Sequence, residues 1–284
     1  MPDQLSFNLA QLESDVASTQ FFGHLHYLAT ATSTSDLALT AAQSGARIGV
    51  WIAGEQTAGR GRGNHAWHSP AGAPQEPAGL YMSALVAPPI PLQSALGLSF
   101  TVAIAVQSAI SSVFGFHIPD QVDIRWPNDL LLNRKKVGGI LIDTASNPAT
   151  PSQAATLRFA VIGIGINLNQ TSFPPELEPI ATSVRRELPQ PAVSRRAEPL
   201  AAAILLALDR EVHRRATDNL QHATCNLSQY SSWIIGKRVR VEARQDGPAS
   251  YTGVTAGLDS HGFLRVKGDD GQLHTVLSGG LREP

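Results

Sequence analysis

Residues 48–86 begin with IGVWIA (48–53), continue through GEQTAGRGRGNHAWHSPAG (54–72) and end with LYMSALV (80–86). Short apolar runs containing β-branched and aromatic residues are typical of buried strands. The glycines and arginines between the two runs are instead typical of a loop. This stretch therefore predicts two buried strands joined by a long Gly/Arg loop.

The segments on either side predict helices and strands in mixed order. Ser33 or Ser35 is expected to start a helix that Gly45 closes, and two further helices are expected over residues 92–114 and 200–215. The first twenty residues are interpreted as a loose lead-in, and residues 173–199 as a proline-spaced loop or hinge. Further strands are expected at 122–126 (VDIRW), 130–133 (LLLN), 136–144 (KVGGILIDT) and 157–169 (LRFAVIGIGINLN).

The pattern of apolar and polar residues changes after Gly236. From there the chain consists of short alternating segments with turn glycines, which predict a small all-β barrel. About fifty residues bury little surface alone, so this module is expected to pack against the rest. The prediction is an α/β (α+β) protein with a mixed-sheet domain over 1–235 and a β-barrel domain over 236–284.

Composition narrows the class of protein. The chain has 284 residues, of which 43% are hydrophobic and 16% charged, and its formal net charge is −1. This balance disfavours disorder, and it disfavours a protein whose whole surface binds nucleic acid. One cysteine excludes an internal disulfide framework. With no signal-like N-terminus and no membrane-length apolar run, we expect a soluble, cytoplasmic protein without membrane contact.

The Gly/Arg loop is the strongest candidate for chemistry. Arg60 and Arg62 alternate with glycines that let the backbone approach a ligand, and guanidinium groups bind phosphate or carboxylate in bidentate fashion. A solvated surface loop and an RNA-binding RGG-like tract are the alternatives. RGG tracts repeat within disordered sequence, whereas this one occurs once between predicted strands. RNA binding is therefore the less favoured interpretation.

Three further segments carry polar residues at predicted strand ends. They are RWPND (125–129), KKVGGIL (135–141) and GIGINLN (163–169). A plain turn explains the first by itself, and a solvated lysine pair explains the second. Core packing does not readily explain the glycines and Asn167 of the third. The sequence contains no P-loop, complete dinucleotide fingerprint, zinc-protease motif or serine-hydrolase motif.

Together, GRGRG with the following W.SP.G, RWPNDL, KKVGGIL and GIGINLN resemble the biotin protein ligases in order and spacing. The resemblance covers roughly residues 22–169, and the C-terminal module is similar to the family's SH3-like domain. It implies the mixed-sheet fold shared with lipoate ligases. It also implies a two-step reaction in which ATP and biotin form biotinyl-5′-AMP and pyrophosphate, and a carrier-protein lysine then takes the biotinyl group.

The resemblance assigns roles residue by residue. It implies that Lys136, Arg60 and Arg62 are catalytic cations at the carboxylate and phosphate, where meeting anions require positive charge. The implied biotin site is Ser33, Thr34, Ser35, Gln56, Arg60, Gly61, Arg62, Lys136 and Gly139. The implied ATP and adenylate site is Arg60, Arg62, Trp67, Asn128, Asp129 and Asn167. Mg²⁺ is expected to arrive on the ATP phosphates, with Asp129 as a candidate ligand and no dedicated protein metal site.

The chain departs from the family pattern at three places. Arg125 stands where many members have lysine. Some members also have further arginines directly after the position of Arg62, and this chain has none there. The link between Gly72 and Gly79 is longer than usual, and we assign it no role. The repressor-type DNA-binding domain is not in this sequence, so we expect no nucleic-acid partner.

Three alternatives remain at this level: a lipoate or octanoate ligase of the same fold, an RNA-binding module that uses the Gly/Arg loop, and a ligase that has lost activity. The GRGR segment of the Gly/Arg loop and the WPND turn favour biotin over lipoate as the substrate. The expected partner is the biotin carboxyl carrier domain of a biotin-dependent carboxylase. Monomer and homodimer are both left open.

Overall fold

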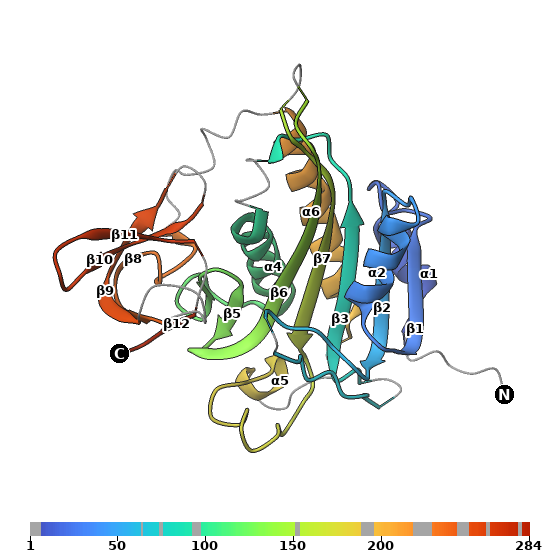
Figure 1. The fold of residues 1–284 in the computed structure, drawn as a ribbon. Coiled ribbons are helices and arrows are strands. Elements are labelled where there is room, and N and C mark those ends of the chain that lie inside the picture. The colour runs from blue at the N-terminus through green and yellow to red at the C-terminus, as the bar shows by residue number, and fades with distance from the viewer. Residues whose placement is uncertain are drawn as a thin grey trace.

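The protein is described by a computed structural model. The description covers residues 7–63, 65–73, 76–92, 98–150, 154–188, 196–217, 229–242, 250–259, 262–277 and 280–284. Within it, a large mixed sheet and a smaller antiparallel sheet form two parts of the molecule (Figure 1). The larger sheet carries helices on both of its faces, and the smaller one lies beside it toward the C-terminus.

The larger sheet has seven strands in the order β1-β2-β3-β7-β6-β5-β4. Only the β1–β2 pair is parallel, and the other neighbours are antiparallel. The strands are β1 (Leu25–Ala31), β2 (Gly49–Gln56), β3 (Gly79–Val86), β4 (Val122–Arg125), β5 (Asp129–Leu132), β6 (Lys135–Asn147) and β7 (Thr156–Asn167). This arrangement confirms the predicted mixed sheet.

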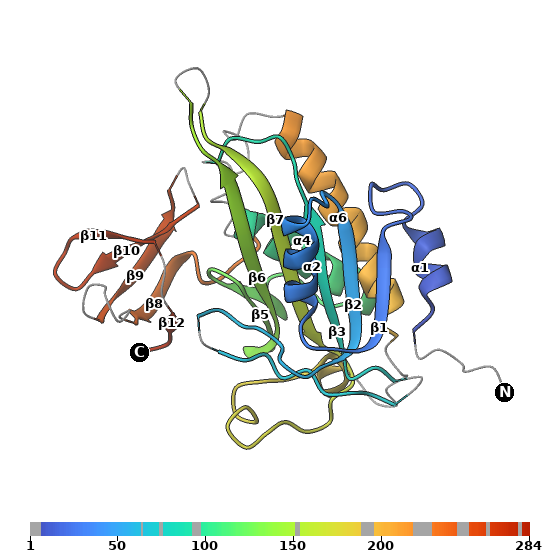
Figure 2. The same ribbon diagram turned by 45° about the vertical axis from the view of Figure 1, so that its right-hand side comes forward.

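Helices cover the sheet on both faces. α2 (Thr34–Gln43) lies on one face, and α4 (Leu98–Phe114) and α6 (Glu198–Thr217) lie on the other (Figure 2). Strand β3 is buried along its whole length because it is covered from both sides. Its even-numbered residues join the large core under α4 and α6, whereas Leu85 packs under α2 with Phe159 and Val161. Two-sided burial explains why this strand reads as a continuous apolar run.

The smaller sheet has five antiparallel strands in the order β11-β10-β9-β8-β12. They are β8 (Ile235–Val241), β9 (Tyr251–Leu258), β10 (Leu264–Gly268), β11 (Leu273–Val276) and β12 (Leu281–Arg282). Val239 and Val266 belong to the same apolar cluster as the main core, and Trp126 Nε1 donates to Gly262 O at 3.3 Å. These contacts confirm that the C-terminal module packs against the rest.

The N-terminus differs from the sequence prediction. The first twenty residues are not a loose lead-in, because α1 (Leu9–Asp15) begins at an Asn8 cap and buries Leu12 in the main core. β1 was not predicted, since its sequence LHYLATA shows no clear alternation of buried and exposed residues. The loop predicted over 173–199 contains the short helix α5 (Val184–Glu187) and the start of α6.

Some predictions fall on residues that lie outside the description. These include the single cysteine, Cys225, for which the sequence favours a packed side chain in a helix over a nucleophile, and the first turn of the predicted helix over 92–114. The longer link between Gly72 and Gly79 is described in part, and there Glu76 forms an ion pair with Arg185 at 2.9 Å. No helix of the described residues is long and apolar enough to cross a membrane.

Candidate functional site

A row of directly paired residues crosses the sheet on the face that carries α2. Arg125 pairs with Asp129, Asp129 with Gly139, Gly139 with Gly165, and Gly165 with Tyr81. Partners in an antiparallel ladder point to the same face. The strand ends singled out in the sequence therefore converge on one line, with two glycines at its centre.

A β-bulge brings Lys136 onto this face. Gly138 pairs with Leu130 and Lys136 pairs with Leu131, so Val137 is an extra residue on β6. Val137 is fully buried in the main core. A Cβ atom on Gly139 would lie 3.6 Å from Lys136 Nζ, which shows that the ammonium stands beside the glycine. The bulge thus directs a cation toward the glycine pair.

Lys136, Asp129 and Arg125 form one ion cluster. Lys136 Nζ lies 2.6 Å from Asp129 Oδ1, and Arg125 Nη2 lies 2.6 Å from Asp129 Oδ2. Burial alone would raise the pKa of Asp129, but the two cations outweigh it and hold the pKa below its usual range. The Asp129 side chain is 17% exposed and that of Lys136 is 31% exposed, so the ammonium remains reachable by a ligand.

Trp67 of the Gly/Arg loop lies over the two central glycines. A Cβ on Gly165 would come within 2.4 Å of Trp67 Nε1, and one on Gly139 within 3.1 Å of the same ring. The Trp67 ring centroid is 5.4 Å from Lys136 Nζ. Its buried Nε1–H has no hydrogen-bond partner among the residues that the structure describes. The glycines therefore make a flat floor that accepts an aromatic ring.

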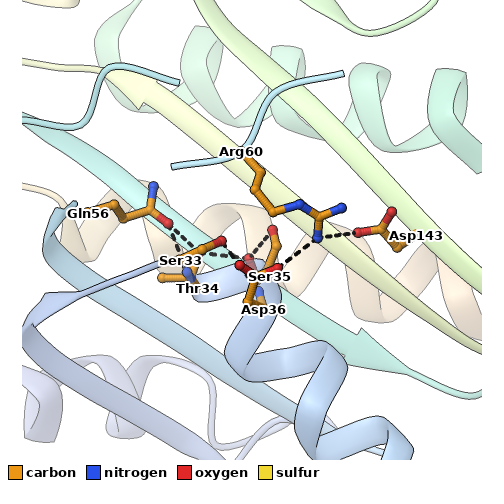
Figure 3. A network of polar contacts seen from close by, with 8 residues as sticks. Ser33, Thr34, Ser35, Asp36, Gln56, Arg60 and Asp143 are labelled. Carbon is orange, nitrogen blue, oxygen red and sulfur yellow. Dashed lines mark hydrogen bonds and ion pairs between the residues drawn. The ribbon is translucent and has the colours of Figure 1, made fainter. Parts of the chain in front are cut away.

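Buried hydroxyl groups line the neighbouring part of the same face (Figure 3). Ser33 caps α2, and its Oγ accepts from the backbone N of Asp36 at 3.3 Å. Ser83 Oγ lies 2.8 Å from Thr34 Oγ1 and 3.0 Å from Ser35 Oγ. Hydroxyls can donate and accept, so the cluster can serve a polar ligand group.

Gln56 ties α2 to the loop. Its Oε1 accepts from the backbone N of Thr34 at 2.8 Å, and its Nε2 donates to Ser69 Oγ at 2.8 Å. The side chain thus bridges the helix N-terminus and the far end of the loop. In the described contacts, Gln56 positions the hydroxyl cluster and the loop together.

The loop is folded back on itself beside the glycine floor. Trp67 N donates to Gly59 O and Gly61 N donates to His65 O, each at 2.8 Å. Tyr81, the last member of the paired row, donates from its hydroxyl to Pro70 O at 3.3 Å. Burial raises the pKa of Tyr81, and nearby Glu55 adds to this, so the phenol stays protonated as a donor.

The two loop arginines differ in their surroundings. Arg60 Nη1 lies 3.0 Å from Asp36 Oδ1 on α2 and 3.0 Å from Asp143 Oδ2 on β6 (Figure 3). Arg62 lies half-buried two residues further along the loop. The structure therefore brings Arg60 between α2 and β6 and binds its guanidinium to two carboxylates.

Asn128 and Asn167, both predicted to bind the adenylate, form hydrogen bonds within the protein. Asn128 Nδ2 donates to Ile140 O at 2.8 Å, and the backbone N of Ile140 donates back to Asn128 O at 2.9 Å. Buried Asn167 donates to Thr182 O at 2.9 Å and accepts from Gln170 Nε2 at 3.1 Å. Both side chains thus brace the ends of the strands that carry the floor.

The motifs in the sequence did not predict Ser83, Asp36, Asp143 or Tyr81 as site residues. Ser83 had a usable signal, since it is the one polar side chain apart from Tyr81 in the apolar run LYMSALV. Asp36 and Asp143 had none, because nothing local distinguishes them from solvated carboxylates. Only their contacts with Arg60 in the structure identify these two aspartates as site residues.

The candidate magnesium ligand Asp129 does not fit that role in this structure. Both of its carboxylate oxygens are already bonded to cations, one to Lys136 and the other to Arg125. Among the described residues, no three His, Cys, Asp or Glu side chains gather into a metal-binding group. We therefore derive no step from a metal held by this carboxylate.

Two protein families match the chain. Residues 28–167 match the biotin/lipoate A/B protein ligase family, and residues 234–279 match the biotin protein ligase C-terminal domain. The first range contains the hydroxyl cluster, the loop, the ion cluster and the glycine floor described above. The second covers most of the smaller sheet.

Relatives and solved structures agree with this match. The bifunctional ligase/repressor BirA of Bacillus subtilis is 34% identical over 252 residues, which cover 87% of this chain and 70% of that protein. The biotin–[acetyl-CoA-carboxylase] ligase of Mycobacterium tuberculosis is 32% identical over 254 residues, covering 88% and 85% respectively. The biotin protein ligase of Aquifex aeolicus in complex with biotin and ATP superimposes with a TM-score of 0.70 at 23% identity, covering 93% of this chain and 100% of that one. That last likeness supports the fold, and the sequence matches show that the chain belongs to the biotin protein ligase family.

Proposed function

We propose that this chain activates biotin with ATP and transfers the biotinyl group to a lysine of a carrier protein. The enzyme class follows from family membership: it is an ATP-dependent biotin–protein ligase. In the first half-reaction a biotin carboxylate oxygen bonds to the α-phosphorus and pyrophosphate leaves. In the second, a lysine amine of the carrier attacks the acyl carbon, AMP leaves with the bonding electron pair, and the amine loses a proton.

The observation that carries the proposal is the reachable ammonium of Lys136 beside the Gly139–Gly165 floor. Two anions, a carboxylate and a triphosphate, must meet in the first step, and a fixed cation lowers the free energy of that encounter. Asp129 holds the ammonium at 2.6 Å and so limits its motion. We assign Lys136 to the biotin carboxylate and the α-phosphate.

The hydroxyl cluster supports recognition of biotin. Thr34, Ser35 and Ser83 present buried donors and acceptors at hydrogen-bond distance from one another. Hydroxyls have further donor and acceptor capacity beyond these mutual bonds, which a ureido ring could use and an apolar acid could not. We assign Ser33, Thr34, Ser35 and Gln56 to this end of the site. We assign Gly139 to the biotin site because it lies beside the Lys136 ammonium.

We assign the other end of the site to the nucleotide. Trp67, whose indole N–H lacks a described partner, is proposed to contact the adenylate or to cover it. Arg62 and Gly61 are proposed to approach the acyl phosphate from the loop. Asn128, Asp129 and Asn167 contribute by bracing strands and by fixing Lys136. Magnesium is proposed to enter on the ATP phosphates.

The acceptor and the setting are also proposals. We infer that the acceptor is the biotin carboxyl carrier domain of a biotin-dependent carboxylase, because family members act on such carriers. Use of ATP supports a cytoplasmic location. We place the domain boundary between residues 235 and 236 and propose that the small antiparallel sheet is SH3-like, as the resemblance implies. Monomer and homodimer are both compatible with the proposed reaction.

The test is exchange of labelled pyrophosphate into ATP, with biotin, lipoate and octanoate in parallel. Exchange with biotin alone is the expected result. Exchange with lipoate or octanoate alone would retain the fold and the chemistry but overturn the substrate. A folded protein that gives no exchange with any acid would overturn the proposed activity.

A further inference from the structure

Arg60 of the loop forms two ion pairs, and they reach two different elements outside the loop. The same atom, Nη1, contacts Asp36 in the first turn of α2 and Asp143 on β6, at 3.0 Å each (Figure 3). Residues 36 and 60 are 24 positions apart in sequence, and residues 60 and 143 are 83 apart. The guanidinium therefore joins the loop to both α2 and β6.

Both carboxylates stand on fixed backbone. The N–H of Asp36 is held by the Ser33 cap of α2, and Asp143 is paired with Val161 in the β6–β7 ladder. The loop is held at its first root, where Thr57 N donates to Ala31 O and Ala58 N donates to Thr32 O. Beyond that root, the ion pairs of Arg60 hold the Gly/Arg segment itself, while Gln56 and Tyr81 bind Ser69 and Pro70 at the far end of the loop.

We propose that Asp36 and Asp143 are positioning residues that act through Arg60 as a latch, holding the loop closed over the glycine floor and slowing escape of the biotinyl-adenylate. The latch is defined as Arg60, Asp36 and Asp143, and the proposal rests on the proposed function. A mixed anhydride is lost to water if it leaves the site before the carrier arrives, so an enzyme gains from slow opening. The latch makes the loop's closed state the stable one.

The latch changes the role proposed for Arg60. A guanidinium bonded to two carboxylates has to break those contacts before it can bind a phosphate. If Arg60 were a phosphate ligand in spite of this, removing either carboxylate would free it and lower the KM for ATP. If Arg60 is a latch, removing a carboxylate leaves the KM for ATP unchanged and speeds release of the adenylate.

The first experiment measures the rate at which preformed biotinyl-adenylate leaves the full-length enzyme. Asp143→Asn and Asp36→Asn should each raise this rate about three- to fivefold, the scale of one partly exposed ion pair, and the double variant about tenfold. In Arg60→Ala the same carboxylate substitutions should have no further effect. Arg60→Lys should release the adenylate faster than wild type, because the shorter lysine side chain does not bring its ammonium to the position of Arg60 Nη1, the one atom that contacts both carboxylates.

A matched control comes from α6 on the opposite face of the sheet. Glu211 and Arg214 form an ion pair with side-chain exposures of 29% and 37%, close to the 29% and 35% of Asp143 and Arg60. Glu211→Gln should leave the release rate unchanged. Additive effects of Arg60→Ala and Asp143→Asn, a lower KM for ATP, or unchanged release would each overturn the latch.

The second experiment needs no substrate and separates the latch from the proposed function. Hydrogen–deuterium exchange of the loop should quicken in Asp143→Asn and in Arg60→Ala, since Gly61 and Trp67 donate the hydrogen bonds that fold it. Unchanged exchange in both variants would overturn the latch. Wild-type enzyme that forms no biotinyl-adenylate, with faster loop exchange in the variants, would overturn the proposed function and retain the latch.

Discussion

Replacing Asp129 with Asn tests whether the ion cluster is held together as the structure indicates. The substitution keeps the shape of the side chain and removes its charge. Asp129 lies 2.6 Å from both Lys136 and Arg125, and its side chain is largely buried. After the change, two cations face each other across a neutral amide. We expect lower stability and slower adenylate formation.

The size of the expected stability loss in Asp129→Asn follows from the burial of the ion pairs. Removing one partner of a buried ion pair costs about 3–5 kcal/mol, because a charge is left without compensation. Lys136 is partly exposed and can rehydrate, so the lower end applies and we expect a loss of about 3 kcal/mol. For a chain of this size, that loss corresponds to a fall in Tm of about 6–12 °C.

The loss of stability caused by Asp129→Asn should become smaller as the pH falls into the acidic range. Asp129 has a folded-state pKa below its unfolded value, so the unfolded chain binds more protons between the two values. Its contribution to stability is therefore complete above the unfolded pKa of about 3.9 and is lost as pH falls through the folded pKa. The gap in unfolding free energy between wild type and Asp129→Asn should be constant near neutral pH and narrow below about pH 4.

Urea unfolding across this pH range measures the gap, with Asp120→Asn as the control. Asp120 is exposed on the turn before β4 and should change stability little. A double-mutant cycle with Lys136→Met should show that the two substitutions are not additive, since each removes the same contact. A loss under about 0.5 kcal/mol, or a gap that widens in acid, would refute the reasoning.

Three further substitutions test other parts of the site and its support. Lys136→Ala should reduce biotin-dependent pyrophosphate exchange by about 10²–10³-fold while circular dichroism stays unchanged. Gly165→Ala should raise the KM for ATP, because its Cβ would lie 2.4 Å from Trp67 Nε1 and displace the ring that is proposed to contact the nucleotide. Trp233→Ala should lower the unfolding free energy by about 3 kcal/mol or more, since the ring is buried and packs under Arg125.

Each of these has a result that would count against it. Exchange within a few-fold of wild type in Lys136→Ala would remove that residue from the reaction. An unchanged KM in Gly165→Ala would mean that Trp67 does not rest on the floor during turnover. For Trp233, the Phe variant should retain most of the stability, and equal losses in the Phe and Ala variants would exclude packing as the cause.

Much of the architecture was predictable from local signals. The β3 run is apolar because both faces of the strand are covered, and α2 begins where Ser33 supplies a cap. β1 and α1 were missed, since their patterns are weak and their burial depends on packing against α6 and β2. The predicted site segments lie together on one face, but Gln56, Asn128 and Asn167 hold protein groups in ways that their motifs do not indicate.

The sequence by itself determined the kinds of elements, the order of the motifs and the family to which they belong. Tertiary structure alone decided which charges meet. Asp129 lies between Arg125 and Lys136 because β5 pairs with both β4 and β6, and Lys136 faces the glycine floor because Val137 bulges out of that register. Arg60 meets Asp143 across 83 positions of chain. Such contacts depend on strand register and on how a loop folds back, and no local pattern of residues encodes either.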